Sequence, residues 1–318
     1  MKAIVTGCAG FIGSALTDYL LKSGYEVIGV DNLSTGQFKF LENALRYPSF
    51  NFINEDLLNL DKLKKLNLNA DIIFHLAANA DVRHGLENTS RDLEQNTIVT
   101  FNVLEIMRHH NIKKIVFSST GSVYGEASII PTPETCPFPI QTSLYGASKV
   151  SCESLIAAYC EGFDFKSWIF RFVSILGERY THGHVFDFYK QLKANPNTLK
   201  VLGDGTQKKS YLYIHDCIEA ILIALHNSNA KVNIFNLGVD AYCDVNYSID
   251  LICNELKVKP KITYSGGNKG WVGDNPFIYL DTKKINSLGW TPSEDISNSI
   301  IKTVRYLKAN EWIFNERN

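Results

Sequence analysis

The first half of the chain alternates short apolar runs, rich in β-branched residues, with longer segments of helical period, and this alternation restricts the fold more than any other feature. The runs predict strands near residues 2–6, 25–30, 50–53, 71–75, 113–119 and 166–170. The segments between them predict helices at Phe11–Ser23, Asp61–Leu66, Arg91–His110 and Leu144–Cys160. Successive βαβ units with right-handed crossovers build a doubly wound parallel sheet, so we expect an α/β fold.

The pattern loosens after about Arg171 into shorter strands and helices, with turns marked by the glycines at residues 203–205 and 266–267. A chain of 318 residues is long enough either for one large α/β domain or for two lobes that share a cleft. We therefore predict a first domain over residues 1–170 and a smaller α/β lobe over residues 171–318, lying over the carboxyl ends of the strands.

Charge and hydropathy narrow the range of partners. The 32 basic and 33 acidic residues nearly cancel, which removes the electrostatic reason to expect binding to nucleic acid or to a membrane surface. No apolar run approaches the length of a membrane span, and Met1 leads into the first strand without a secretory leader. We expect a soluble cytoplasmic protein.

Cysteine and histidine spacing predicts no metal site. The seven cysteines are scattered without a CxxC pair, which argues against a disulfide framework and against a zinc site. His182 and His184 have the spacing of metal ligands, but no carboxylate or cysteine cluster accompanies them. We expect these histidines to make loop contacts with a substrate or a partner.

Gly7, Gly10 and Gly13 stand between the first predicted strand and the first predicted helix. Glycines at this point permit a tight turn and let backbone N–H groups approach a pyrophosphate, to which the helix N-terminus adds partial positive charge. The GxxGxxG spacing on its own is also compatible with a simple turn. Its position between strand and helix favours dinucleotide binding.

Asp31 closes the second predicted strand, where a carboxylate can accept hydrogen bonds from both ribose hydroxyls and repels a 2′-phosphate. This residue therefore predicts NAD rather than NADP as the cofactor, although a carboxylate that merely caps the strand is the alternative. Asp56, after the third strand, is a candidate for the adenine amino group. An acidic turn residue explains Asp56 equally well.

Tyr145 and Lys149 lie four residues apart in a predicted helix, which places the phenol and the ammonium group on one face. A free phenol has a pKa of about 10, and a nearby cation that stabilises the phenolate would make it a usable base. With 15 tyrosines and 32 basic residues, a YxxxK match arises by chance on the order of once. Ser118 and Thr120 strengthen the interpretation, because the end of the fifth strand faces the ligand crevice of a doubly wound sheet; turn formation is the alternative for these hydroxyls.

Four motifs together resemble the extended short-chain dehydrogenase/reductase family over nearly the whole chain: the glycine trio, FHLAA at residues 74–78, FSSTGSVYG at 117–125, and the YxxxK pair. Within that family, DNLSTG at 31–36, GDGT at 203–206 and SYLYIHD at 210–216 are most similar to UDP-glucose 4-epimerases. The resemblance implies a Rossmann-type fold, NAD as cofactor, a nucleotide-diphosphate sugar as substrate, and a homodimer formed through the helices at 91–110 and 144–160.

The resemblance also implies residue roles. Tyr145 would be the acid and base, Lys149 would lower its pKa and hold the nicotinamide ribose, and Thr120 would bond the sugar hydroxyl. Asn96 would stabilise the central helix beside the cofactor. The residues expected to surround NAD are Gly7, Gly10, Phe11, Ile12, Gly13, Asp31, Asn32, Ser34, Thr35, Gly36, Asp56, Leu57, Leu76, Ala77, Ala78, Asn96, Ser118, Tyr145 and Lys149.

The two residues after Thr120 indicate the reaction. The 4,6-dehydratases of this family place an Asp-Glu pair there, whereas this chain has Gly121 and Ser122. Without those carboxyl groups the elimination of water lacks its acid and base. We therefore expect 4-epimerisation of UDP-glucose, UDP-galactose or their N-acetyl forms through a 4-keto intermediate. The alternatives are a nucleotide-sugar 4-dehydrogenase or ketoreductase, a 4,6-dehydratase, and a non-catalytic dinucleotide-sensing protein.

The expected substrate residues depart from the family pattern. Ser174 stands where the epimerases have an asparagine, and Lys209 and Trp271 stand where they have diphosphate-binding arginines. A lysine cannot make the bidentate contact that arginine makes with phosphate. Ile278 falls at the sugar-pocket gate and is compatible with N-acetylated sugars. The expected substrate residues are Arg83, Thr120, Tyr145, Ser174, Arg179, Lys209, Trp271 and Asp274, with Lys208 and Lys269 as further cations that could compensate, or could be plain surface charge.

Overall fold

The computed structural model describes residues 1–82, 84–137 and 140–315. The chain forms two compact units, and neither is a single stretch of sequence. The first unit contains Met1–Val123, Leu144–Arg171 and Ala224–Phe235; the second contains Tyr124–Ser143, Phe172–Ile223 and Asn236–Asn318. The chain passes from one unit to the other at several points, and one of them, after Arg171, is one residue beyond the boundary expected between residues 170 and 171.

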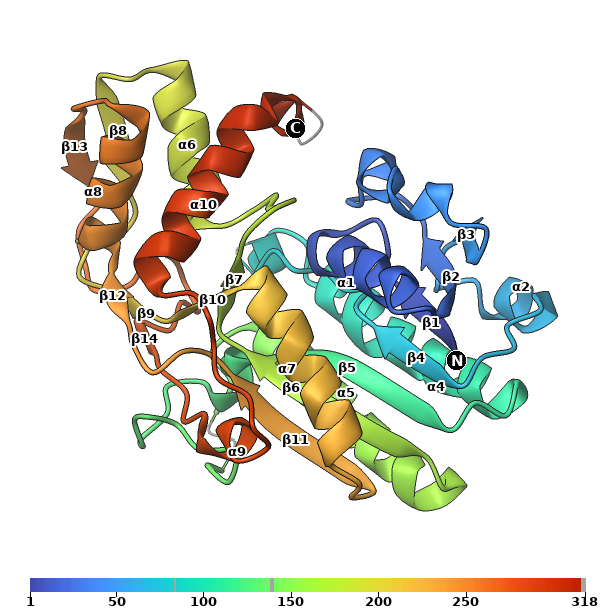
Figure 1. The fold of residues 1–318 in the computed structure, drawn as a ribbon. Coiled ribbons are helices and arrows are strands. Elements are labelled where there is room, and N and C mark those ends of the chain that lie inside the picture. The colour runs from blue at the N-terminus through green and yellow to red at the C-terminus, as the bar shows by residue number, and fades with distance from the viewer. Residues whose placement is uncertain (83, 138–139, 316–318) are drawn as a thin grey trace. The chain divides into compact units, whose positions relative to one another are not determined.

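A seven-stranded sheet forms the centre of the first unit (Figure 1). Its strand order is β11-β6-β5-β4-β1-β2-β3, and the paired strands β1–β2, β1–β4, β2–β3 and β4–β5 run parallel. The strands are β1 (Lys2–Thr6), β2 (Glu26–Asp31), β3 (Phe50–Asn54), β4 (Ile72–His75), β5 (Lys114–Thr120), β6 (Lys166–Phe172) and β11 (Val232–Leu237). The expected doubly wound α/β fold is confirmed.

Helices pack on both faces of this sheet, and its strands β1, β2 and β4 are accordingly almost entirely buried. Ile4 of β1, Ile73 of β4 and Ile115 of β5 pack with α4 (Val99–His109) and α5 (Leu144–Phe163) in one hydrophobic core. Helix α1 (Phe11–Lys22) packs on β1 and β2 and is not part of that core. Helix α2 is Leu60–Lys65 and packs against α4.

Two elements of the first unit differ from the expectation. The helix expected at Arg91–His110 is divided into α3 (Ser90–Asp92), a π-helical segment η4 (Leu93–Ile98) and α4. Strand β11 joins the sheet beside β6, although it comes from the part of the chain assigned to the second lobe. Its pairing joins residues more than sixty positions apart, and the short sequence VNIFNL does not indicate such a partner.

The second unit is built from short parallel and antiparallel strands with helices packed on them. Its strands are β7 (Ser174–Leu176), β8 (Thr198–Val201), β9 (Lys208–Lys209), β10 (Tyr211–Tyr213), β12 (Cys243–Asp244), β13 (Lys261–Tyr264) and β14 (Phe277–Ile278). Its longer helices are α6 (His184–Ala194), α8 (Val245–Leu256) and α10 (Ile296–Ala309), and α7 (Ile214–Asn227) leads back to the first unit. Short segments α9 (Lys283–Asn286) and η6 (Glu311–Phe314) complete it.

Side-chain caps explain where two of these helices begin. Asp244 accepts a hydrogen bond from the backbone N–H of Tyr247 at the start of α8, and Asp295 does the same for Asn298 at the start of α10. Of the helices in the described part of the chain, none is long and apolar enough to serve as a membrane span.

Candidate active site

The glycine turn between β1 and α1 leaves no space for a Cβ atom at Gly7 or Gly13. Gly7 has a φ of +69°, and a Cβ atom there would lie 2.8 Å from the backbone nitrogen of Ala77. A Cβ atom on Gly13 would lie 2.0 Å from the carbonyl oxygen of Gly7. Helix α1 begins after Gly10 with no side-chain cap and no acidic residue in its first turn. Its N-terminus therefore keeps the partial positive charge that favours an anion.

Asp31 ends β2 next to this turn and is 8% exposed. One carboxylate oxygen accepts the N–H of Ala9 at 2.9 Å, and the other accepts the N–H of Leu33 at 2.8 Å. Burial raises the pKa of Asp31, while these two hydrogen bonds act in the opposite direction. Each oxygen keeps a second lone pair, so the carboxylate can still accept two ribose hydroxyls.

Asp56 is explained by local structure. Its carboxylate accepts the backbone N–H of Leu58 at 2.8 Å and the side-chain amide of Asn32 at 2.9 Å. These bonds are those of an acidic turn residue before α2, which was the alternative interpretation. Leu57, beside it, is buried in the hydrophobic core of the first unit. A contact of either residue with adenine stays a prediction.

Asn96 lies in the π-helical segment and is buried. Its side-chain oxygen accepts the N–H of Asn79 at 2.9 Å, and its nitrogen donates to Ser148 Oγ at 2.9 Å and to Asp92 Oδ1 at 3.3 Å. A π-helical turn often marks a functional position. Here it lets Asn96 connect the segment after Leu76–Ala78 to the helix that carries Tyr145, which is the placement that its expected role requires.

Tyr145 and Lys149 are in the first two turns of α5, and the structure brings them together with the end of β5. The ammonium group of Lys149 donates to the carbonyl of Ser118 at 2.9 Å and lies 6.0 Å from the ring centre of Tyr145. The side chain of Thr120 lies close enough to the phenol of Tyr145 to affect its pKa. Lys149 is 2% exposed, so this cation is held inside the protein.

The direction of the Tyr145 pKa shift differs from the expectation. Desolvation raises the pKa of the phenol to about 12, with the charge of Asp92 acting the same way, and the side chain of Thr120 lowers it. Burial also lowers the pKa of Lys149. Lys149 is not among the causes of the Tyr145 shift, so the expected lowering does not set the pKa of the phenol in this structure. The sequence shows the spacing of the two groups but not the loss of water around them.

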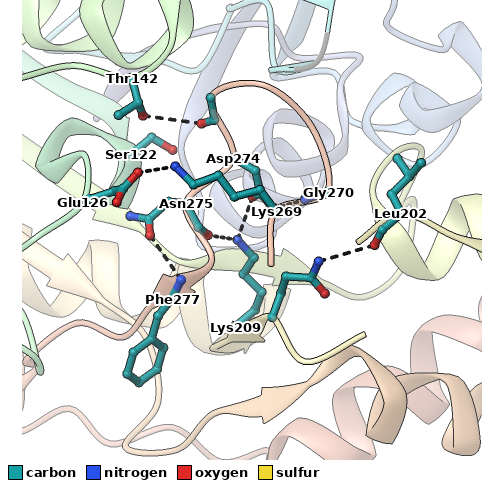
Figure 2. A network of polar contacts seen from close by, with 12 residues as sticks. Ser122, Glu126, Thr142, Leu202, Lys209, Lys269, Gly270, Asp274, Asn275 and Phe277 are labelled. Carbon is teal, nitrogen blue, oxygen red and sulfur yellow. Dashed lines mark hydrogen bonds and ion pairs between the residues drawn. The ribbon is translucent and has the colours of Figure 1, made fainter. Parts of the chain in front are cut away.

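In the second unit, Lys209 forms an ion pair with the carboxylate of Asp274. Its ammonium group contacts Asp274 Oδ1 at 2.9 Å and donates to the carbonyl of Asn275 (Figure 2). Asp274 is 3% exposed and also accepts the N–H of Gly270 at 3.0 Å. Burial lowers the pKa of Lys209, and Asp274 acts in the opposite direction. The positive charge of Lys209 is thus partly neutralised by Asp274.

The other substrate candidates have varied surroundings. Figure 2 shows Lys269 directed at Glu126, with which it forms an ion pair, and Lys208 lies over the rings of Tyr242 and Phe277. Trp271 lies in the turn that leads to Asp274, and Ile278 is half-buried in β14. Ser174 is exposed at the start of β7, Arg179 has a φ of +68°, and Arg83 lies outside the described residues.

The two candidate histidines contact aromatic rings. His184 begins α6 with its ring 4.9 Å from that of Tyr211, and His182 stacks on Tyr180 at 6.1 Å. Burial and the charge of Lys209 lower the pKa of His184 to about 3, so its imidazole is neutral. Within residues 1–82, 84–137 and 140–315, no cluster of His, Cys, Asp and Glu could hold a metal ion.

The sequence model of the NAD-dependent epimerase/dehydratase family matches residues 3–238. The chain belongs to this family. A protein of Methanocaldococcus jannaschii, named provisionally as a UDP-glucose 4-epimerase, is 36% identical over 96% of this chain and 98% of its own length. NAD-dependent epimerases and dehydratases are enzymes, and NAD is their cofactor.

Two solved epimerase structures are similar along nearly the whole chain. The Thermotoga maritima UDP-glucose 4-epimerase with UDP-glucose is 30% identical, with a TM-score of 0.87, over 98% of this chain and all of that one. The Bacillus cereus UDP-glucuronic acid 4-epimerase with UDP-glucuronic acid and NAD is 31% identical, with a TM-score of 0.88, over 97% and 99%.

The residues of the first unit fit the NAD of this epimerase/dehydratase family. Side chains at Gly7 and Gly13 would fill the turn that a pyrophosphate approaches, and the Asp31 carboxylate is already oriented by two backbone bonds. Sequence reasoning missed one buried group of the first unit, which consists of Ser119, Glu153 and Arg171. Its only signal in the sequence is that Glu153 follows Lys149 by one further helical turn.

Proposed function

We propose that the chain is an NAD-dependent 4-epimerase of a UDP-activated hexose that works through a 4-keto intermediate. The observation that carries this proposal is the contact of Tyr145 with Thr120, next to the buried ammonium group of Lys149. A protein that only senses NAD needs the glycine turn and Asp31 but has no use for these three groups. The UDP sugars in the names of the similar epimerases support the choice of nucleotide.

In the proposed mechanism, Thr120 and Tyr145 hold the sugar 4-hydroxyl group between them, and the Tyr145 phenolate accepts its proton. The chemistry that NAD supplies when bound is reversible transfer of hydride at sugar C4, together with a positive charge that favours the phenolate. Tyr145 then returns the proton to the C4 oxygen after the keto sugar has turned over. The opposite configuration results without net oxidation.

The position after Thr120 favours epimerisation over dehydration. The hydroxyl of Thr120 donates to Ser122 Oγ at 3.2 Å and accepts the N–H of Ser122 at 3.1 Å. These two bonds fix the threonine rotamer. Gly121 and Ser122 offer no carboxyl group that could protonate a leaving hydroxyl, so the elimination of water from the oxidised sugar lacks an acid at these positions.

We also propose that two copies of the chain associate through α4 and α5. Among the described residues, several large apolar side chains near these helices are exposed: Leu93, Ile98, Phe101 and Leu144. Burial in a dimer would remove them from water. Light scattering at two protein concentrations tests this, and a monomer at both would contradict it.

The test of the function is NMR of the purified protein with UDP-glucose, UDP-N-acetylglucosamine and UDP-glucuronate, without added cofactor. We expect the C4 epimer of at least one sugar to appear while absorbance from NADH stays low. Accumulation of NADH or of a 4-keto sugar would favour the dehydrogenase instead. Unchanged turnover after Tyr145→Phe would exclude the proposed chemistry.

A further inference from the structure

Three consecutive residues at the carboxyl end of β5 each contact one of three side chains that are spaced four residues apart on α5. The pairs are Thr120 with Tyr145, Ser118 with Lys149, and Ser119 with Glu153. Side chains four residues apart lie on one helix face. The face that carries the proposed acid–base pair therefore has a third member, to which the proposed mechanism gives no role.

Glu153 is held by two neighbours in the interior of the first unit. Ser119 donates to its Oε1 at 2.5 Å, and Arg171 of β6 donates from Nη2 to Oε2 at 2.7 Å and from Nε to Oε1 at 3.1 Å. Glu153 is 4% exposed, Arg171 2% and Ser119 3%. A buried carboxylate is costly unless it is paired and hydrogen-bonded, and here both oxygens are bonded. These bonds fix the position of the Glu153 carboxylate.

Lys149 needs a nearby negative charge more than most lysines do. Its ammonium group is buried, donates to the carbonyl of Ser118, and lies 4.8 Å from the ring centre of Phe117. Neither group carries a full negative charge. Glu153 follows one turn along α5, where the Cβ atoms of such pairs are about 5–6 Å apart.

We propose that Glu153, oriented by Arg171 and Ser119, is a positioning residue whose carboxylate keeps the buried Lys149 an ammonium ion. Only the catalytic consequence rests on the proposed function, because the charge of Lys149 can be measured without turnover. Loss of that charge would remove the cation beside the Tyr145 phenolate. Ser119 also fixes the distance between Glu153 and the strand end that carries Thr120.

Ionisable groups other than Glu153 also face Lys149 and contribute to the electrostatic surroundings of its ammonium group. Tyr145 and Cys152 are on the same helix, Asp92 comes from α3, and His75 comes from β4. The pKa of His75 is lowered to about 3 by burial and by the charge of Lys149, so this imidazole is neutral. Burial lowers the pKa of Lys149, and Cys152, Glu153 and Asp92 all oppose that effect.

The test is a direct titration of Lys149 by NMR of protein with 13C-labelled lysines, in which Lys149→Met assigns the signal. Glu153→Gln removes the charge but leaves Arg171 unpaired in the interior, and such a variant can fail to fold. The double variant Glu153→Gln/Arg171→Met removes both charges, a replacement that is often neutral for stability.

Glu105→Gln is the matched control. Glu105, on α4, also bonds an arginine and a tyrosine, Arg108 and Tyr159. Tyr159 is ten residues beyond Lys149 on α5, about 15 Å along the helix. The same loss of a carboxylate is therefore tested far from Lys149.

We expect the Lys149 midpoint to fall by about one pH unit in the double variant, where the loss of the Arg171 cation offsets part of the effect of losing the Glu153 carboxylate, and to stay in place in the control. In an active enzyme the alkaline limb of kcat/KM would move down by the same amount, about tenfold less activity above that limb. A midpoint equal to that of the native protein in the double variant would overturn the proposal, and so would a double variant that does not fold. Failure of the proposed function would appear separately, as native protein that makes no epimer.

Discussion

The glycine turn offers the sharpest test of the cofactor site. In Gly13→Ala the new Cβ atom would lie 2.0 Å from the carbonyl oxygen of Gly7 and 2.8 Å from its carbonyl carbon. Real Cβ atoms essentially never come closer than 3.0 Å to such atoms. The turn or the start of α1 must therefore move by about 1 Å, and both contacts are to backbone, which a side-chain rotation cannot relieve.

The size of the effect follows from two opposing contributions. Overpacking of this kind costs about 1–3 kcal/mol, and alanine in a helix returns up to about 1 kcal/mol relative to glycine. We expect a net loss of about 1–2 kcal/mol, which corresponds to a Tm lower by about 1.5–3 °C for a chain of this length. Scanning calorimetry measures this, and a second series with NAD measures binding, because a ligand at free concentration c that binds the folded protein stabilises it by RT ln(1 + c/Kd) and so raises the Tm.

The NAD-dependent rise in Tm should be small or absent in Gly13→Ala, because the displaced turn no longer presents its N–H groups to the pyrophosphate. Gly162→Ala is the control: this glycine is also helical, but a Cβ atom there meets nothing within 4 Å. The control should equal or exceed the native protein in Tm and bind NAD normally. A Gly13→Ala protein that does the same would refute the reasoning.

Further variants test the site group by group. Tyr145→Phe should lower kcat by about 10²–10⁴ while the Tm stays within a few degrees, as measured by sugar NMR and calorimetry; a loss below tenfold would contradict the acid–base role. Thr120→Val removes the hydroxyl group that lowers the Tyr145 pKa, so the pH dependence of kcat/KM should move to higher pH, and no movement would exclude that contact. Asp31→Asn should weaken NAD binding about tenfold or more in a titration, since it removes charge-assisted bonds to ribose; equal affinity would assign Asp31 to strand capping alone. His75 has a lowered pKa of about 3 in the folded state, so its contribution to stability is present above the ordinary value of 6.5 and is lost as the pH falls below it. Urea unfolding at pH 6.5 and 5 should show a loss of about 2 kcal/mol from this residue, absent in His75→Gln.

Local patterns in the sequence were sufficient for the architecture around the cofactor site. The alternation of apolar runs and helical segments predicted β1, α1 and α5 to within a few residues. The glycines were informative for the same reason, because a turn that admits no Cβ atom leaves only one residue type. Spacing of four residues was enough to place Tyr145 and Lys149 on one face of a helix.

The π-helical segment could not be predicted from local sequence patterns. Residues 91–110 carry a continuous helical pattern, and the wider turn at Leu93–Ile98 follows from buried bonds of Asn96 with Asn79 and Ser148. Those partners lie 17 and 52 residues away along the chain. A local pattern contains no information about such contacts.

The sequence by itself determined the residue types at the site, their order along the chain, and the helix and strand ends that carry them. Only the tertiary structure decided the pKa shifts and the ion pairs of these residues. Desolvation raises the pKa of Tyr145, and Asp274 forms an ion pair with Lys209. Glu153 joins the face of α5 that carries Tyr145 and Lys149. The physical reason is that periodicity is set by neighbours in the chain. Burial and ion pairing depend on groups that packing brings together from distant positions.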